Sequence, residues 1–236
     1  MPSNDFIVPL CNEPVRVLYA DDQLLFIDKP TGLLSVPGKL AANKDCLISR
    51  VQQGHNVIGE QSGKMANDAY PEARIVHRLD MDTSGVMVLA LNADCHRALS
   101  RQFEQRQTEK QYCAKVFGLV ADDYGSIELP IISDWPNRPL QKICADTGKH
   151  AITRYQVISR NQADQSSRLL LKPVTGRSHQ LRIHLAAIDH PILGCSFYAH
   201  PQARSASKRL LLHASQLTIN HPINDKALTI NSPAPF

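Results

Sequence analysis

The sequence predicts an α+β domain built on a mixed, mainly antiparallel sheet. Short runs of apolar and β-branched residues outnumber the helical patterns along the 236-residue chain. Most connections between these runs are too short for the helical crossovers that parallel strands require. In addition, 43% of the residues are hydrophobic and 20% are charged, which is ample for a core in a soluble protein.

Composition argues against several classes of protein. No apolar run approaches the roughly 20 residues that span a bilayer, and residues 1–10 lack the basic start and apolar centre of a signal peptide. The six cysteines are scattered and form no CxxC pair, a pattern typical of reduced thiols. We therefore expect a cytoplasmic protein with no membrane segment and no metal. No feature indicates an oligomer, so we expect a monomer.

The first part of the chain divides into an arm, a hairpin and a helix. Residues 1–14 hold three prolines and no periodicity, which predicts a flexible N-terminal arm before a single domain at 15–236. Strands are predicted at 15–19 and 24–28, with a turn between them, and a helix at 45–52. Residues 53–70 are rich in glycine and poor in apolar residues, which predicts a long mobile loop.

The remaining elements follow from shorter patterns. Asn92 can cap a helix that runs to about residue 107. Gly125 is read as the start of a turn, and a third helix is predicted at about 179–188. The predicted strands are 86–91, 112–120, 151–158, 169–174, 210–219 and 227–230.

The stretch from His77 to Gly85 is the richest in chemistry, and it lies directly before the apolar run 86–91. Asp80 is its leading candidate, because the nearby Arg78 would help to keep a positioned carboxylate ionised as nucleophile or base. Alternatively, Asp80 is structural and caps the turn that follows. Asp80 and Asp82 also resemble the DxD pair of aspartate-dependent phosphatases, but the residues before them include charges where a buried strand is needed.

A second polar stretch, Thr175 to Arg182, combines a glycine turn, two arginines and a helix start. It could bind a phosphate or supply a cation to Asp80, or it could be an ordinary basic surface. His179 and His184 are accompanied by no metal-binding motif, and His184 fits the apolar side of its helix, as a core histidine would.

Positive charge is concentrated between Arg138 and Arg182. This segment has nine Lys and Arg against two Asp, a balance of +7, whereas the whole chain carries +4. One-sided positive charge is typical of a protein that binds a polyanion, although a solvated basic face has the same composition.

With these residues placed, the chain resembles the RluA family of pseudouridine synthases. His77-Arg78-Leu79-Asp80 with Thr83-Ser84-Gly85 is similar to the central motif of that family, and residues 176–184 are similar to its second signature. Four further matches occur in the same order, at 29–33, 110–112, 190–194 and 210–214. The resemblance implies a fold with a central active-site cleft, and an isomerase that converts uridine to pseudouridine in structured RNA without cofactor or metal.

The resemblance also implies roles for individual residues. Asp80 would be the essential aspartate, attacking C1′ of the sugar or removing a proton from C2′. Arg182 would pair with Asp80, and Tyr112 would stack on the flipped base. Arg78 would fill the gap that the base leaves or hold a phosphate. The remaining predicted substrate-binding residues are His77, Arg177, His179 and Gln180.

Finer matches, at 35–38, 134–139 and 194–198, resemble the namesake of the family. They imply large-subunit ribosomal RNA and the tRNA anticodon stem-loop as substrates. No N-terminal RNA-binding module of the S4 type fits before Val15, and the 53–70 loop is longer than in the namesake. The alternative is a protein that binds structured RNA without catalysis.

Overall fold

The protein forms two units in the computed structural model, which describes residues 6–59 and 69–236. The N-terminal unit is made from the described residues of 7–110 together with 214–235. The central unit contains residues 111–213 with Phe6 and Phe236. The N-terminal unit is therefore built from two separate stretches of chain. Whether the two units act as the single catalytic domain expected for residues 15–236 stays a prediction.

The sheet of the N-terminal unit begins with the predicted hairpin. β1 (Val15–Ala20) pairs antiparallel with β2 (Leu24–Lys29). In the turn between them, the Asp21 carboxylate accepts the Gln23 and Leu24 N–H groups, both at 2.7 Å. The sheet continues in the order β2, β5 (Ser84–Ala90) and β12 (Leu212–Asn220), and β13 (Ala227–Asn231) pairs with β12. These elements confirm the predicted strands.

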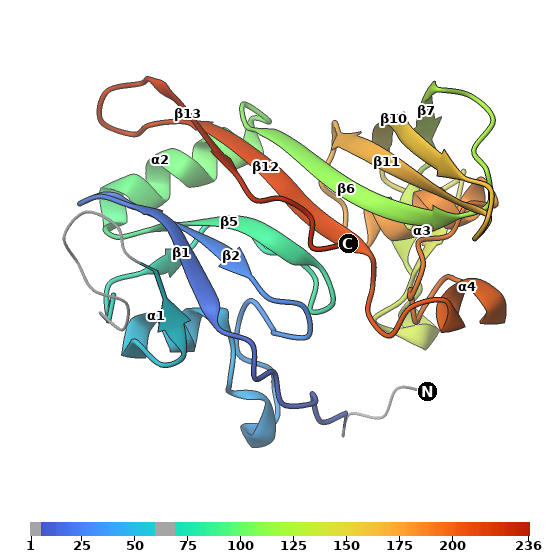
Figure 1. The fold of residues 1–236 in the computed structure, drawn as a ribbon. Helices are drawn as coiled ribbons and strands as arrows, with labels where there is room; N and C mark the ends of the chain where they lie inside the picture. The colour runs from blue at the N-terminus through green and yellow to red at the C-terminus, as the bar shows by residue number, and fades with distance from the viewer. Residues whose placement is uncertain (1–5, 60–68) are drawn as a thin grey trace. The chain divides into compact units, whose positions relative to one another are not determined.

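Helices cover both sides of β5, whose residues are all buried. α2 (Ala93–Glu104) packs Cys95 and Leu99 against Val86 and Val88, and the Asn92 side chain caps it by accepting the Cys95 N–H at 2.9 Å. α1 (Leu47–Gln53) lies on the other side of this sheet (Figure 1). A short 3-10 helix, η1 (Ala41–Asn43), precedes α1. The predicted cap at Asn92 and the helices predicted at 45–52 and 92–107 are confirmed.

The described part of the predicted arm, residues 6–14, differs from a loose segment. The buried Arg50 guanidinium donates to the carbonyls of Cys11 at 2.5 Å and Glu13 at 3.0 Å. It is held in turn by Asp45 at 2.6 Å. A buried arginine needs all of these acceptors, so it fixes the segment that supplies them.

The predicted 53–70 loop is also partly regular. Val57–Ile58 forms β3, which pairs in parallel with β1. β4 (Arg74–Ile75) pairs antiparallel with β5 a little further on. Residues 60–68, the rest of the predicted loop, lie outside the described residues.

In the central unit, four strands pair antiparallel in the order β6 (Glu109–Phe117), β11 (Ser166–Pro173), β10 (Ile152–Asn161) and β7 (Tyr124–Glu128), and these four strands are called the central sheet here. β7 corrects the turn expected at Gly125. A Cβ atom at Gly125 would collide with the Tyr155 ring on β10. The glycine marks a close approach within a strand rather than the end of one.

α3 (Gln180–Ala187) packs against this sheet, with Leu181 and Leu185 set against Leu169 and Leu171. A small hairpin of β8 (Ile131–Ser133) and β9 (Gln141–Ile143) carries a 3-10 turn, η2 (Trp135–Asn137), at its tip. α4 (Pro201–Ser205) follows α3. These short elements have too few residues to show a period in the sequence.

The pairing pattern confirms the predicted fold class. β1 and β3 pair in parallel, whereas the pairs of the hairpin, of β2 with β5 and of the central sheet are antiparallel. Few helices accompany this many strands, so the protein is α+β with a mixed, mainly antiparallel arrangement.

Candidate active site

Asp80 lies in the loop between β4 and β5 of the N-terminal unit, where it is half-buried. The loop is tight, because the Thr83 N–H donates to the Asp80 carbonyl at 3.1 Å. Gly85 then enters β5 with a φ of +116°, and a Cβ atom there would collide with the backbone of Ala214 on β12. The backbone that carries Asp80 is therefore fixed by the turn that closes at Thr83 and by the packing of β5 at Gly85.

Residues 29–33 hold the Asp80 loop in place through hydrogen bonds. Lys29 is fully buried, and its ammonium donates to the carbonyls of Pro30 at 2.8 Å, Leu33 at 2.7 Å and Met81 at 2.9 Å. The Gly32 N–H also donates to the Met81 carbonyl, at 2.9 Å. A buried ammonium gathers carbonyl oxygens around it, so it ties two segments that are distant in sequence.

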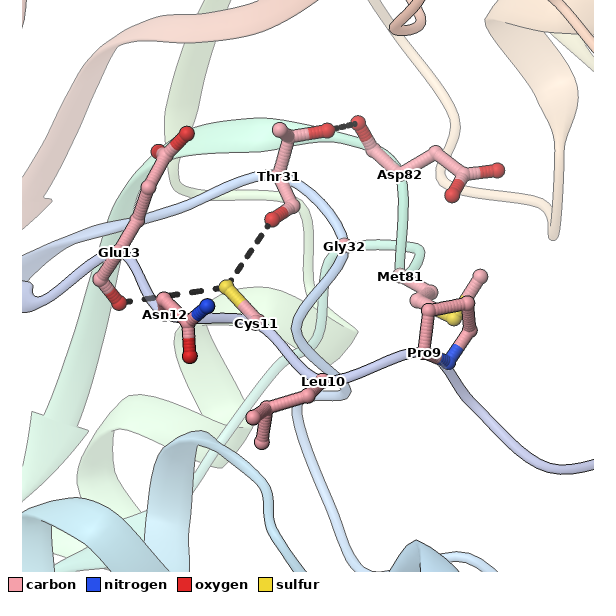
Figure 2. Close-up of a pocket in the computed structure, with 9 residues that line it drawn as sticks. All are labelled: Pro9, Leu10, Cys11, Asn12, Glu13, Thr31, Gly32, Met81 and Asp82. Carbon is pink, nitrogen blue, oxygen red and sulfur yellow. Dashed lines mark hydrogen bonds between the residues drawn. The ribbon is translucent and has the colours of Figure 1, made fainter.

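A further bond fixes the loop beyond Met81. The Thr31 hydroxyl donates to the Asp82 carbonyl at 2.7 Å, and the Asp82 carboxylate points away from Thr31 (Figure 2). A cavity of about 360 Å³ lies here, between the arm and the loop, and the Cys11 thiol on its wall donates to the Thr31 carbonyl at 3.3 Å. Asp82 thus takes part in holding the loop through its backbone.

His77 and Arg78 differ in their surroundings. The His77 ring stacks on Phe103, with 4.4 Å between ring centroids, and its Nε2 accepts the Val88 N–H at 3.1 Å. Burial, reinforced by the positive charge of Lys110, lowers the pKa of His77 to about 3. Arg78 is exposed. Its guanidinium is therefore available to a ligand, while His77 joins the loop to β5 and α2.

Tyr112 and Arg182 both belong to the central unit. Tyr112 is half-buried on β6, opposite Leu171 of β11, and packs against the same core as α3. Arg182 is 2% exposed on α3. Its guanidinium carbon lies 4.9 Å from the centroid of the Phe197 ring and 5.8 Å from that of Tyr198. Aromatic faces stabilise a cation that is withdrawn from water. The predicted pairing of Arg182 with Asp80 stays a prediction.

The start of α3 is an ordered turn. His179 caps the helix with a φ of +55°, a backbone conformation that costs a non-glycine residue about 1 kcal/mol or more. Its Nδ1 forms a hydrogen bond with the Tyr198 hydroxyl at 2.7 Å. The ring is thereby oriented beside Phe197, at 5.5 Å between centroids.

Gln180 and Arg177 stabilise the same turn. The Gln180 side-chain oxygen accepts the Thr175 hydroxyl at 2.7 Å and the Arg177 N–H at 3.0 Å. Its amide group donates to the Ile152 carbonyl at 2.9 Å and to Thr153 at 3.1 Å. Gln180 is buried, so these bonds support a structural contribution to the turn. Direct substrate contacts of Gln180, Arg177 and His179 stay predictions.

His184 is the core histidine that the sequence indicates. It is fully buried, with Nδ1 3.0 Å from the Thr153 hydroxyl and Nε2 3.0 Å from the Leu129 carbonyl. Burial lowers its pKa.

Within residues 6–59 and 69–236, no group of three or more His, Cys, Asp or Glu residues is placed to hold a metal ion. No helix in the described part of the chain is long and apolar enough to cross a membrane.

Two sets of residues at the site were not singled out from the sequence. Lys29 stood only as part of a motif, and its contact with Met81 joins residues that are 52 positions apart. Phe197 and Tyr198 fall in the matched 194–198 segment, but a motif does not reveal that they flank Arg182. In each case the available signal was the motif, and the missing information was a long-range contact.

Comparison with known proteins gives consistent results. A family model described as RNA pseudouridylate synthase matches residues 23–187. The chain is 50% identical over 220 residues to the dual-specificity RNA pseudouridine synthase RluA of Escherichia coli O6:H1, which covers 93% of each chain. It is 53% identical over 206 residues to the protein of the same name from Yersinia pestis, which covers 87% of this chain and 92% of the relative.

Solved structures of human proteins are also similar. RNA Pseudouridylate Synthase Domain Containing 1 has a TM-score of 0.74 and 27% identity, covering 97% of this chain and 86% of that one. RNA Pseudouridylate Synthase Domain Containing 4 has a TM-score of 0.69 and 27% identity, covering 93% and 88%.

Proposed function

The chain belongs to the RNA pseudouridylate synthase family, and we propose that it modifies two structured RNAs, large-subunit ribosomal RNA and the tRNA anticodon stem-loop, with Asp80 as the essential carboxylate. The family confirms the predicted activity: the protein is an isomerase that acts on RNA. The choice of two RNAs is supported by the 50% identity to an enzyme named for its dual specificity.

The observation that carries the role of Asp80 is the fixed backbone around it. Lys29, Thr31 and Gly32 hold the carbonyls of the two residues that follow Asp80. A side chain on so rigid a loop is already positioned, so little entropy is lost when the substrate arrives. In this proposal, Asp80 attacks C1′ of the target nucleotide or removes a proton from C2′.

The remaining steps follow from the chemistry of the product. The N1–C1′ bond breaks, the uracil turns, C5 bonds to C1′, and the C5 proton is lost while N1 regains a proton. Substrate and product are isomers, so the reaction consumes no oxidant, reductant or group donor. We therefore propose that it needs no cofactor or metal.

Arg182 and Tyr112 complete the proposed site. Arg182 would pair with Asp80 and keep the carboxylate ionised, because a close cation favours the charged form. Tyr112 would stack on the base once it has left its helix, and its hydroxyl could take the C5 proton. Arg78, which is exposed, would occupy the vacated position or hold a phosphate.

We further propose that the enzyme acts as a monomer in the cytoplasm. The monomer is supported by the absence of any oligomer signal in the sequence. The compartment is supported by the scattered cysteines, which are typical of a reducing environment.

The test is tritium release from RNA transcripts labelled with [5-³H]uridine, one set of tRNA and one of ribosomal RNA, without added metal. Wild-type enzyme should release tritium from both. Asp80→Asn should be slower by at least about 10³-fold, because it removes the reacting carboxylate.

Asp82→Asn is the matched control. Asp82 is two residues away, and its carboxylate points away from the Thr31 bond that its backbone makes (Figure 2). This variant should retain activity within a few-fold. Tritium release by Asp80→Asn at the wild-type rate would exclude Asp80 as the essential carboxylate, and release from one RNA alone would exclude the second substrate.

A further inference from the structure

The tip of the β8–β9 hairpin exposes the single tryptophan of the chain. The Trp135 side chain is 67% exposed, although indole is among the most apolar of side chains. The guanidinium carbon of Arg138 lies 3.1 Å from the centroid of its ring. With one face under a guanidinium and most of its surface still exposed, the ring presents its other face to solvent.

Backbone and side-chain hydrogen bonds hold the turn that carries this ring. The Asp134 N–H donates to the Leu140 carbonyl at 2.9 Å, and the Leu140 N–H donates to the Asn137 carbonyl at 3.0 Å. The Asn137 amide donates to the Asp134 carboxylate at 2.8 Å. These bonds close the turn on both sides of Trp135, so a ligand that stacks there needs to order little of the protein.

The hairpin is also fixed to the start of α3. The Gln141 N–H on β9 donates to the Tyr198 hydroxyl at 2.9 Å, and the same hydroxyl bonds to His179 at 2.7 Å. Ile131 of β8 packs with Ile183 of α3 in a small cluster. The position of Trp135 is therefore set relative to the helix that carries Arg182.

The charge around the ring points to the class of ligand. Arg138 and Lys142 are both exposed, and the acid nearest to Trp135 in sequence, Asp134, is bonded to Asn137. An apolar protein partner would be expected to meet further apolar side chains here, but the flanking residues are Pro136, Asn137 and Arg138. An aromatic face stacked on the Arg138 guanidinium, with the exposed Lys142 on the same hairpin, suits an unpaired nucleotide, which offers a base to stack and a phosphate to neutralise.

We propose that Trp135 and Arg138 form a stacking platform for an unpaired base of the RNA substrate, at a position other than the nucleotide that reacts. This inference rests on the proposed function, because its ligand is the substrate RNA. Loop bases that are already unstacked are the ones that such aromatic platforms bind. The platform would thus help to select RNAs whose loops present a second unpaired base.

The first test uses the fluorescence of Trp135, which no other tryptophan obscures. Asp80→Asn enzyme, for which we expect RNA binding with strongly slowed turnover, is titrated with the tRNA anticodon stem-loop, and RNA binding is measured in parallel by anisotropy of an end-labelled RNA. Stacking should quench the emission along the same binding curve. Binding of the RNA with unchanged emission would overturn the platform.

The second test compares variants in the tritium-release assay. Trp135→Ala should raise KM by roughly tenfold and leave kcat within about twofold, because stacking away from the reacting bond contributes to substrate and transition state alike. Trp135→Phe, which keeps a stacking surface, should recover most of the loss. Tyr124→Ala is the control, because Tyr124 is an aromatic residue of the same unit with 68% exposure.

The outcomes separate this inference from the proposed function. Wild-type turnover with an unchanged KM for Trp135→Ala would refute the platform and leave the enzyme assignment intact. Absence of wild-type turnover would contradict the proposed substrates, and the fluorescence titration would still decide whether Trp135 meets RNA. If Trp135→Ala melts at a lower temperature than wild type, Trp135→Phe and the titration decide whether the ring stacks on a base.

Discussion

At the scale of single residues, His77 shows how a histidine three residues before the candidate aspartate is kept neutral. A ring nitrogen that accepts the Val88 N–H cannot carry a proton, so the neutral ring holds its proton on Nδ1. Phe103 covers the ring, and burial with the charge of Lys110 lowers its pKa to about 3. These contacts support a structural role for His77, while its predicted contact with substrate stays a prediction.

This arrangement makes stability depend on pH in a defined direction. Between about pH 3 and 6.5 the unfolded chain protonates His77 and the folded protein does not. The unfolding free energy should therefore fall by about 1.4 kcal/mol for each pH unit below 6.5. Above pH 6.5, His77 contributes its full stabilisation to the folded state. The variant His77→Gln keeps an acceptor for the Val88 N–H but does not titrate.

Urea unfolding at pH 7.5 and pH 5.0 checks this prediction. The wild type should lose about 2 kcal/mol more than His77→Gln between the two conditions, because the variant lacks this proton uptake. All other ionisable groups are the same in the two proteins, so the comparison cancels their contributions. Equal losses in the two proteins would show that His77 is not held neutral.

At the scale of elements, Gly85 allows β5 and β12 to approach each other. Gly85 has a φ of +116°, and a Cβ atom there would overlap the Ala214 backbone. Gly32 also has a positive φ, +77°, but among the described residues no atom lies within 4 Å of its Cβ position. The two glycines therefore separate the cost of backbone strain from the cost of a collision.

The variants Gly85→Ala and Gly32→Ala should differ accordingly. Gly32→Ala should cost about 1–2 kcal/mol for the left-handed backbone alone. Gly85→Ala should cost about 4 kcal/mol or more, because the two strands must also move apart. Denaturant unfolding of the two variants measures both values. A Gly85→Ala protein as stable as Gly32→Ala would contradict the close packing of β5 on β12.

Local patterns were sufficient to predict the longer elements. The turn of the first hairpin and the Asn92 cap of α2 follow from residues that lie within a few positions of one another. β3, β4, β8 and β9 have two or three residues each, too few to show a period. The arm was predicted to be loose because its partner, Arg50, is more than 35 residues away.

In the candidate site, too, features that depend on neighbouring residues were predictable, whereas features that depend on long-range contacts were not. The Asp80 loop could be placed from its own residues, since a polar stretch precedes an apolar strand. The clamp of Lys29 on Met81 could not, because nothing in either segment indicates the other. The roles of Arg182 and Tyr112 came from resemblance to a family, and spacing alone did not distinguish them from a basic helix start and a core tyrosine.

At the scale of the whole molecule, the nine basic residues of 138–182 do not form one surface. Arg182 is buried beside aromatic rings. Leu171 packs against α3. Lys172 is the next residue of the same strand, so the Lys172 side chain points outward from the opposite face of the central sheet. Lys142 is exposed on the hairpin that is fixed to the start of α3. The segment can therefore contact RNA with only some of its charges.

Salt dependence of binding should identify these charges. Lys142→Gln should reduce the slope of log K against log salt by about one, because each phosphate contact releases counterions. Lys172→Gln removes the same charge from the opposite sheet face and should leave the slope unchanged. Equilibrium binding of the anticodon stem-loop at several salt concentrations measures both slopes. Identical slopes for the two variants would mean that RNA does not distinguish the faces.

The split make-up of the N-terminal unit has a consequence for synthesis. Residues 111–211 emerge from the ribosome after the Asp80 loop but before β12 and β13, which complete the sheet around β5. Until then β5 has an open edge where Ala214 will lie, and the strand that follows the Asp80 loop is unsupported. We therefore expect the nascent enzyme to remain inactive until its last strands are released, so that a half-made chain does not modify the RNA around it.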